Sequence, residues 1–217
     1  IYWNKTYEPD YLKFDKYLST NLKINQIHFQ IFKGNILNEF EEVKKADGTP
    51  FKVFTPYWRN AEKFYIEKVP SIQKSISKCK KKLSFFKKTV NLGEISPKNQ
   101  WSKKFEKHWY PCEENALKNL RAFIKVIENY SNSRNFPSIS GTSKLSPYIK
   151  HGQIHVETIW EECSKIKRPG VNKFLTEIGW REFNHTLINN FPYMLKGNYS
   201  KKFDKFPWVK NLSLIHI

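Results

Sequence analysis

The chain changes from loop to helix within the stretch Gly141-Thr142-Ser143-Lys144-Leu145-Ser146-Pro147-Tyr148. Ser146 followed by Pro147 is typical of a helix N-cap with a proline in the first turn. Thr142, Ser143 and Ser146 place three hydroxyl groups beside the cation of Lys144. Hydroxyls, free backbone N–H groups and a cation at a helix N-terminus suit a phosphate or pyrophosphate. The alternative is a loop rich in serine and threonine that only caps its own helix.

A second motif predicts a helix with one polar side that faces a cavity. It reads Phe174-Leu175-Thr176-Glu177-Ile178-Gly179-Trp180-Arg181-Glu182-Phe183-Asn184. At 3.6 residues per turn, one face carries Glu177, Trp180, Arg181 and Asn184, and the opposite face carries Leu175, Ile178, Gly179 and Phe183. An ordinary amphipathic helix would place Trp180 with the apolar residues, so this pattern favours a cavity. Gly179 would allow close packing. The alternative is a buried tryptophan beside a surface ion pair.

The rest of the chain predicts an α/β segment followed by an all-α segment. A strand at 1–3, a helix at 10–21 and a strand at 27–32 form one unit of a parallel sheet. A short helix is predicted at 36–45. Apolar residues at helical spacing predict a longer helix at 116–129, and the pattern stays helical to residue 190. Because one strand–helix–strand unit is only part of a doubly wound sheet, we expect the chain to begin inside an α/β domain.

The composition fits a folded and strongly basic protein. Of the 217 residues, 39% are hydrophobic and 16% aromatic, which excludes global disorder. The net charge of +18 attracts polyanions such as nucleic acid, although an AT-rich genome would also enrich lysine. Cys79, Cys112 and Cys163 are widely spaced, as expected of free thiols in a reducing compartment. We find no long apolar run and no signal-peptide pattern, and therefore expect a cytoplasmic protein that is not in a membrane.

Two histidines, His151 and His155, lie four residues apart in the string HGQIH. A zinc site needs three or four ligands at suitable spacing, and no third ligand accompanies this pair. We therefore expect no metal site.

Three strings resemble the flavin-binding region of the DNA photolyase/cryptochrome family, in the family's order and spacing. They are NYSNSRNFP at 129–137, GTSKLSPYIKHGQI at 141–154 and FLTEIGWREF at 174–183. The earlier strings IYWNKTYEP and DGTPFKVFTPYWR resemble the N-terminal domain of the same family. The chain is identified as a fragment of a family member, most similar to the class I photolyases that repair cyclobutane pyrimidine dimers.

The resemblance implies an α/β region followed by an all-α region. Residues 1–60 would be the C-terminal part of a Rossmann-like, parallel-sheet antenna domain, and residues 61–105 a long interdomain linker. Residues 106–211 would be the first half of the helical FAD-binding domain. Residues 212–217 depart from the family and are expected to be a non-native or truncated tail. The aromatic residues of the segment 47–59 are expected to pack rather than to act in catalysis.

The resemblance also implies the roles of individual residues. FAD would be bound by Tyr130, Thr142, Ser143, Lys144, Leu145, Ser146, Phe174, Glu177, Trp180, Arg181 and Asn184. Glu177 and Trp180 would be catalytic and face a flipped-out dimer, and together with Arg134 they would bind DNA. Lys144 stands where the family often has arginine, so the charge is kept and the bidentate fork is lost.

The function implied is light-driven repair of UV-damaged DNA by a light-dependent carbon–carbon lyase. Photoexcited reduced FAD would donate an electron to the dimer, and a folate or deazaflavin antenna is implied for the full-length protein, which we expect to be a monomer. Cyclobutane dimers and (6-4) photoproducts both remain possible lesions. The alternatives are a cryptochrome-type blue-light photoreceptor and a flavin-free nucleic-acid-binding remnant. We expect the 217 residues alone to be inactive.

Overall fold

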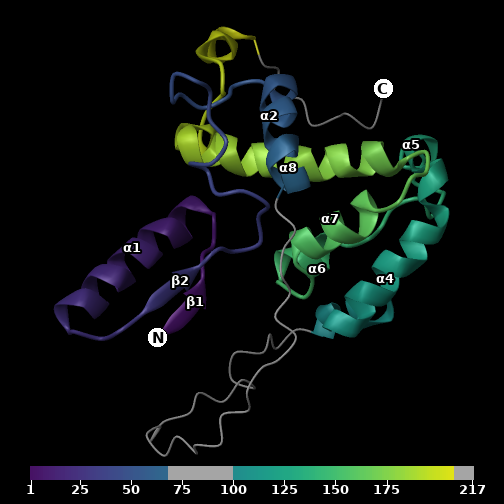
Figure 1. The fold of residues 1–217 in the computed structure, drawn as a ribbon, viewed down its shortest axis with the longest axis horizontal. Helices are drawn as coiled ribbons and strands as arrows, with labels where there is room; N and C mark the ends of the chain where they lie inside the picture. Colours follow the sequence, from purple (N-terminus) through teal and green to yellow (C-terminus); the bar gives the residue numbers. More distant parts are fainter. Residues whose placement is uncertain (68–99, 208–217) are drawn as a thin grey trace, which may run out of the picture.

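The computed structural model describes residues 1–67 and 100–207. The middle of the predicted linker, the expected tail at 212–217 and Cys79 lie outside the described residues. The described part is mostly helical and contains a two-stranded parallel sheet. Figure 1 shows the sheet and its helix at one side of the molecule, away from the larger helical body.

The sheet unit matches the prediction of a strand, a helix and a second strand. Strand β1 (Tyr2–Asn4) pairs in parallel with β2 (Gln30–Phe32), and helix α1 (Pro9–Ile24) makes the crossover between them. Pro9 at the start of α1 replaces a backbone N–H that would have no helical partner. Of the residues in α1, Leu22 alone is buried. The unit therefore contributes little to the main core.

The predicted helix at 36–45 is wrong, because this segment forms turns instead. The backbone N–H of Leu37 donates a hydrogen bond of 2.7 Å to the carboxylate of Glu182, far away in the sequence. Ile36, Leu37 and Phe40 are buried. Tertiary partners have replaced the helical hydrogen bonds that the local pattern favoured.

The helical body begins with α2 (Phe54–Glu67), which runs past residue 60 into the predicted linker. The later elements are the short 3-10 helix η1 (Gln100–Lys107), α4 (Glu113–Val126), η2 (Ile127–Asn129), α5 (Tyr130–Ser133), α6 (Ser146–Lys150), α7 (Val156–Ser164), α8 (Val171–Asn190), η3 (Pro192–Leu195) and η4 (Lys201–Lys205). The helix predicted at 116–129 is confirmed as α4 continued by η2. The predicted cap at Ser146 is displaced, because α6 begins with Ser146 itself and Leu145, which precedes it, makes no side-chain cap.

Helix α8 is the centre of the body, and α2, α5 and α7 contact it (Figure 1). Its buried residues include Phe174, Ile178 and Phe183, which belong to the main hydrophobic cluster. Gly179 lies against the ring of Trp58 on α2, and a Cβ atom there would lie well inside 3.0 Å of that ring. The expected close packing at Gly179 is confirmed.

No helix in residues 1–67 and 100–207 has both the length and the apolar character needed to cross a membrane. Within the same residues, no three His, Cys, Asp or Glu side chains are gathered in a way that could hold a metal ion. His155 instead lies 3.0 Å from the carbonyl oxygen of Gly34.

Replacing Gly179 by alanine is expected to destabilise the fold by about 1–2 kcal/mol, because overpacking against Trp58 exceeds the gain in helix propensity. Chemical denaturation of both proteins measures the difference. Gly197→Ala is the matched control, since a Cβ at Gly197 would meet only the Tyr193 carbonyl oxygen, at 3.9 Å. Equal free energies of unfolding for Gly179→Ala and the parent protein would contradict the packing at α2 and α8.

Candidate functional site

A cavity of about 380 Å³ lies between the loop before α6 and one side of α8. It is lined by Tyr130, Thr142, Ser143, Lys144, Ser146, Ile149, Phe174, Glu177, Ile178 and Arg181. Eight of the eleven residues predicted to bind a cofactor are in this wall, and they come from three separate stretches of the chain. Leu145 is instead buried in the core, and Trp180 and Asn184 are exposed outside the lining. The structure therefore brings together most of the predicted set.

One end of the cavity is aromatic. The rings of Tyr130 and Phe174 meet edge to face, with centroids 5.4 Å apart, and both contact Phe123 of α4. Burial raises the pKa of the Tyr130 hydroxyl, so this group stays a neutral hydrogen-bond donor at ordinary pH. The aromatic end offers apolar surface and one donor, which suits a planar heterocycle.

The other part of the wall is polar and cationic. Thr142, Ser143 and Ser146 contribute hydroxyl groups, and Lys144 and Arg181 contribute positive charge. Lys144 has a φ of 54°, which is uncommon for a residue with a side chain. Thr142, Ser143 and Lys144 also line a second cavity of about 360 Å³ beside α4. The loop is therefore a thin wall between two cavities, and its donors suit an anionic group such as a diphosphate.

Arg134 and Glu177, both predicted to contact DNA, form an ion pair with each other. Lys173 is a second partner of Glu177, with a distance of 3.1 Å between Nζ and Oε1. Burial by itself would raise the pKa of Glu177, but hydrogen bonds from Arg134 and Lys173 hold it below its usual range. The Arg134 guanidinium also lies over the Tyr130 ring, 5.6 Å from its centroid. Arg134 thus connects the rim of the cavity to its aromatic end.

Trp180 lies beside the cavity and is 41% exposed. Its ring stacks on Phe54 of α2, with centroids 3.8 Å apart and an angle of 10° between the planes. Phe54 in turn stacks on Trp58. One side of the Trp180 ring is therefore supported by a column of aromatic side chains, while much of the indole stays accessible to solvent.

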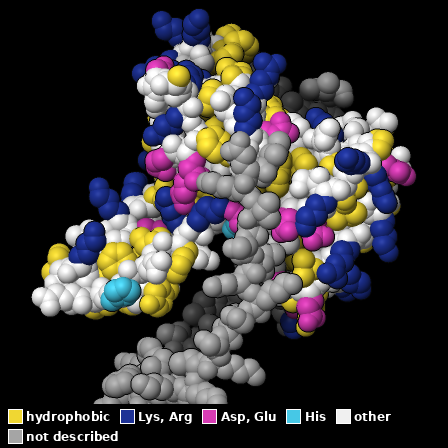
Figure 2. All heavy atoms as spheres, in the orientation of Figure 1, with side chains coloured by type: hydrophobic (Ala, Val, Ile, Leu, Met, Phe, Trp, Pro, Cys, Tyr) yellow, Lys and Arg dark blue, Asp and Glu magenta, His cyan; other side chains and the backbone are white. Residues whose placement is uncertain are grey.

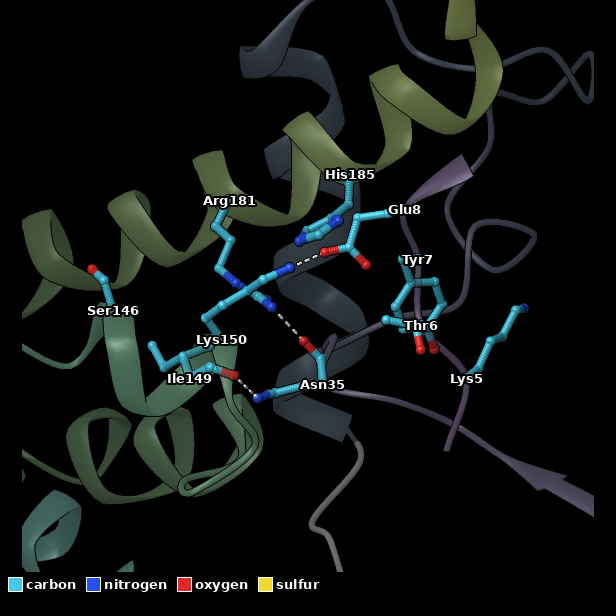
Figure 3. Close-up of a pocket in the computed structure, with 10 residues that line it drawn as sticks. All are labelled: Lys5, Thr6, Tyr7, Glu8, Asn35, Ser146, Ile149, Lys150, Arg181 and His185. Carbon is cyan, nitrogen blue, oxygen red and sulfur yellow. Dashed lines mark hydrogen bonds and ion pairs between the residues drawn. The ribbon is translucent and has the colours of Figure 1, made fainter. Parts of the chain in front are cut away.

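Arg181 extends from α8 between the first cavity and a further cavity of about 240 Å³. Figure 3 shows this further cavity, with Arg181 directed from α8 at Asn35 in the segment after β2, and His185 beside Glu8 in the segment after β1. Arg181 donates to the carbonyl oxygen of Asn35 and to the carboxylate of Glu182, both at 2.5 Å. Across the cavity, Lys150 of α6 pairs with Glu8. These contacts connect the N-terminal segment to the helical body.

The sequence and the fold of this chain are similar to those of known proteins. The family model for DNA photolyase matches residues 1–74. A deoxyribodipyrimidine photo-lyase of Agrobacterium fabrum is 30% identical over 213 residues, which are 96% of this chain and 44% of that relative. Among solved structures, a bacterial class III photolyase from Agrobacterium tumefaciens has a TM-score of 0.79 at 30% identity, and the match covers 96% of this chain and 44% of that one.

The chain belongs to the DNA photolyase/cryptochrome family. Cryptochrome-2 of Arabidopsis thaliana also matches, at 26% identity over 96% of this chain and 37% of that relative. Both kinds of photolyase-family protein are therefore among its relatives. The chain spans less than half the length of these relatives.

Several residues that lie beside this cavity or contact its lining were not given a site role from the sequence. Asn35, Glu182 and His185 carried no expected role, and Phe54 was expected only to pack. Glu182 is part of the string WREF, but its helical position pointed away from the predicted polar face. Its partners belong to the turns at 35–38, which the local sequence pattern had suggested were helical. Only a correct prediction of turns at 35–38 could have indicated from the sequence that Glu182 has polar partners there.

His185 gives the site a defined pH response. Burial, and the nearby charges of Arg181 and Lys150, lower the pKa of His185 to about 4, while Glu8 opposes this effect. Between pH 6.5 and 4 the unfolded chain takes up a proton that the folded chain does not, so acidification lowers the free energy of unfolding.

We expect the parent protein to lose stability relative to His185→Gln as the pH falls through this window, by on the order of 2–3 kcal/mol at pH 4. Urea denaturation of both proteins at a series of pH values measures the difference, and titrating groups that do not interact with His185 cancel in the comparison. A difference that stays constant between pH 6.5 and 4 would contradict a depressed pKa for His185.

Proposed function

We propose that the full-length protein repairs cyclobutane pyrimidine dimers in DNA with light, using reduced FAD held in the cavity between the 142–146 loop and α8. The observation that carries the proposal is the convergence of three separate stretches on this one cavity. The photolyase names of the relatives support the same reaction. Because the solved relative is a class III photolyase, the proposal includes that class as well as class I.

The residues of the cavity fit FAD by their chemistry. The hydroxyls of Thr142, Ser143 and Ser146, with the charges of Lys144 and Arg181, would hold its diphosphate. Tyr130 and Phe174 would hold one of its ring systems. When bound, reduced FAD supplies the electron that splits the dimer after excitation by blue light. Trp180 and Asn184, which are exposed beside the lining, are proposed to act at the edge of the site, and the buried Leu145 is proposed to hold the 142–146 loop against the core.

DNA would approach the face that carries Trp180, Glu177 and Arg134. The exposed part of the Trp180 ring offers a flat apolar surface for a base that has left the duplex. Glu177 stays ionised and can accept a hydrogen bond from a base edge, provided that its pairing with Arg134 loosens when DNA binds. Arg134 would then contact a phosphate. Figure 2 shows Lys and Arg side chains spread over the face of the molecule in view, which favours the approach of a polyanion.

The N-terminal region is proposed to be the end of a Rossmann-like antenna domain. The parallel pair β1 and β2, joined by α1, is the right unit for such a sheet. We propose residues 1–60 for this domain, residues 61–105 for the linker and residues 106–211 for the first half of the FAD-binding domain. A folate or deazaflavin antenna would be bound by the full-length protein.

A cryptochrome-type photoreceptor is the second candidate, because Cryptochrome-2 matches 96% of the chain. The two functions differ in whether light drives repair. A supported and solvent-accessible Trp180 favours repair, since a protein that only signals needs no surface for a flipped base.

Trp180→Ala in the full-length protein is expected to weaken binding of dimer-containing DNA by about 1–3 kcal/mol, the usual contribution of a stacked base. Light-driven repair at limiting DNA should fall in proportion. Trp101→Ala is the matched control, because Trp101 is also exposed and lies outside the cavity.

Light-driven repair by the parent protein and these two variants distinguishes a photolyase from a photoreceptor. Equal repair by Trp180→Ala and the parent protein would contradict the role of Trp180, and no repair by the parent protein would favour the photoreceptor.

A further inference from the structure

Glu182 is a nearly fully buried carboxylate in the middle of α8, with 2% of its surface exposed. Its Oε2 atom accepts the backbone N–H of Leu37 at 2.7 Å, and its Oε1 atom accepts Nη1 of Arg181 at 2.5 Å. Desolvation raises the pKa of Glu182 to about 7, although Arg181 and the backbone N–H of Leu37 oppose the shift. An ionised carboxylate at this position is costly, and an apolar residue of similar size would often be more stable.

The pairing of Arg181 with Glu182 is not the default for neighbouring residues on a helix. Side chains at i and i+1 point about 100° apart and do not normally meet. The Arg181 guanidinium has to turn across the surface of α8 to reach the carboxylate, which orders a long side chain at an entropic cost. The hydrogen bond to Glu182 therefore determines the direction in which the Arg181 side chain points.

A second contact holds the other side of the same guanidinium. Nη2 of Arg181 donates to the carbonyl oxygen of Asn35 at 2.5 Å. Asn35 is itself held in place, because its side chain donates to the carbonyl oxygens of Ile149 and Ile154 and accepts the backbone N–H of Val156 at 2.8 Å. Figure 3 shows Arg181 directed at this asparagine. With two fixed acceptors, the planar fork keeps one orientation.

Arg181, whose guanidinium is fixed in this way, is one of the residues that line the proposed FAD cavity. We propose that Glu182 is a positioning residue for the cofactor: with the Asn35 carbonyl, it holds Arg181 in the orientation that binds the FAD diphosphate. The inference rests on the proposed function. Glu182 does not line the cavity and would not touch the cofactor. Its role would be to orient Arg181, which does line the cavity.

A double-mutant cycle on the full-length protein tests this role. FAD dissociation constants are measured by flavin fluorescence for the parent protein, Glu182→Gln, Arg181→Gln and the double variant. Glu182→Gln keeps the size of the side chain and is expected to weaken FAD binding about tenfold, as when a hydrogen bond to a charged group is lost. In the Arg181→Gln background the same change is expected to weaken binding by less than about twofold, because no guanidinium remains to be positioned.

The matched control is Glu39→Gln. Glu39 is a partly buried carboxylate that pairs with Lys5 and Tyr7 in the N-terminal region and does not line the FAD cavity. This variant is expected to bind FAD like the parent protein. A second readout uses protein without flavin, where hydrogen exchange of the Leu37 amide should be faster in Glu182→Gln and unchanged in Glu39→Gln. If Glu182→Gln does not fold, Glu182→Asp replaces it in the same cycle.

Three results would overturn the proposal, and they can be told apart. If the parent protein binds FAD and Glu182→Gln binds it equally well, the positioning role alone is wrong. If the losses from Glu182→Gln are equal in the two backgrounds, Glu182 acts on stability and not through Arg181. If the parent protein binds no FAD, the proposed function fails and the positioning role fails with it.

Discussion

Helix α8 has to bury one side in the core while its other side lines a cavity, and the rest of the structure depends on that division. Gly179 allows the Trp58 ring of α2 to approach the helix, and Phe183 and Ile178 complete the buried side. With the helix fixed in rotation by this packing, Glu177 and Arg181 reach the cavity and Trp180 stacks on Phe54. Stability and the proposed chemistry therefore share the same twenty-residue helix.

The polar contacts at 35–38 connect this helix to the sheet region. A buried carboxylate on α8 accepts an N–H from the turn at Leu37, and the neighbouring arginine donates to Asn35. The same arginine lines two cavities, one on each side of this junction. A change in the N-terminal region would be transmitted to the proposed FAD site through these hydrogen bonds, because the intervening groups are buried or held by several partners.

Local pattern was enough to predict the parallel strand–helix–strand unit, the α4 helix and the two faces of residues 174–184, because each depends on a regular period along the chain. The convergence of residues such as Tyr130, Thr142 and Arg181 came from the family resemblance, since spacing alone does not bring distant segments together. The turns at 36–45, the displaced start of α6 and the role of Glu182 were missed. Each of these depends on a tertiary partner, such as the carboxylate that takes the Leu37 N–H from 145 positions away.

The central claim is that the cavity between the 142–146 loop and α8 holds the diphosphate of FAD. A crystal structure of the full-length protein grown with FAD is the most direct measurement. The account predicts diphosphate oxygens within hydrogen-bond distance of the Thr142, Ser143 or Ser146 hydroxyls and of the Arg181 guanidinium. A flavin bound elsewhere, with Arg181 and the loop residues making no contact to it, would contradict the account.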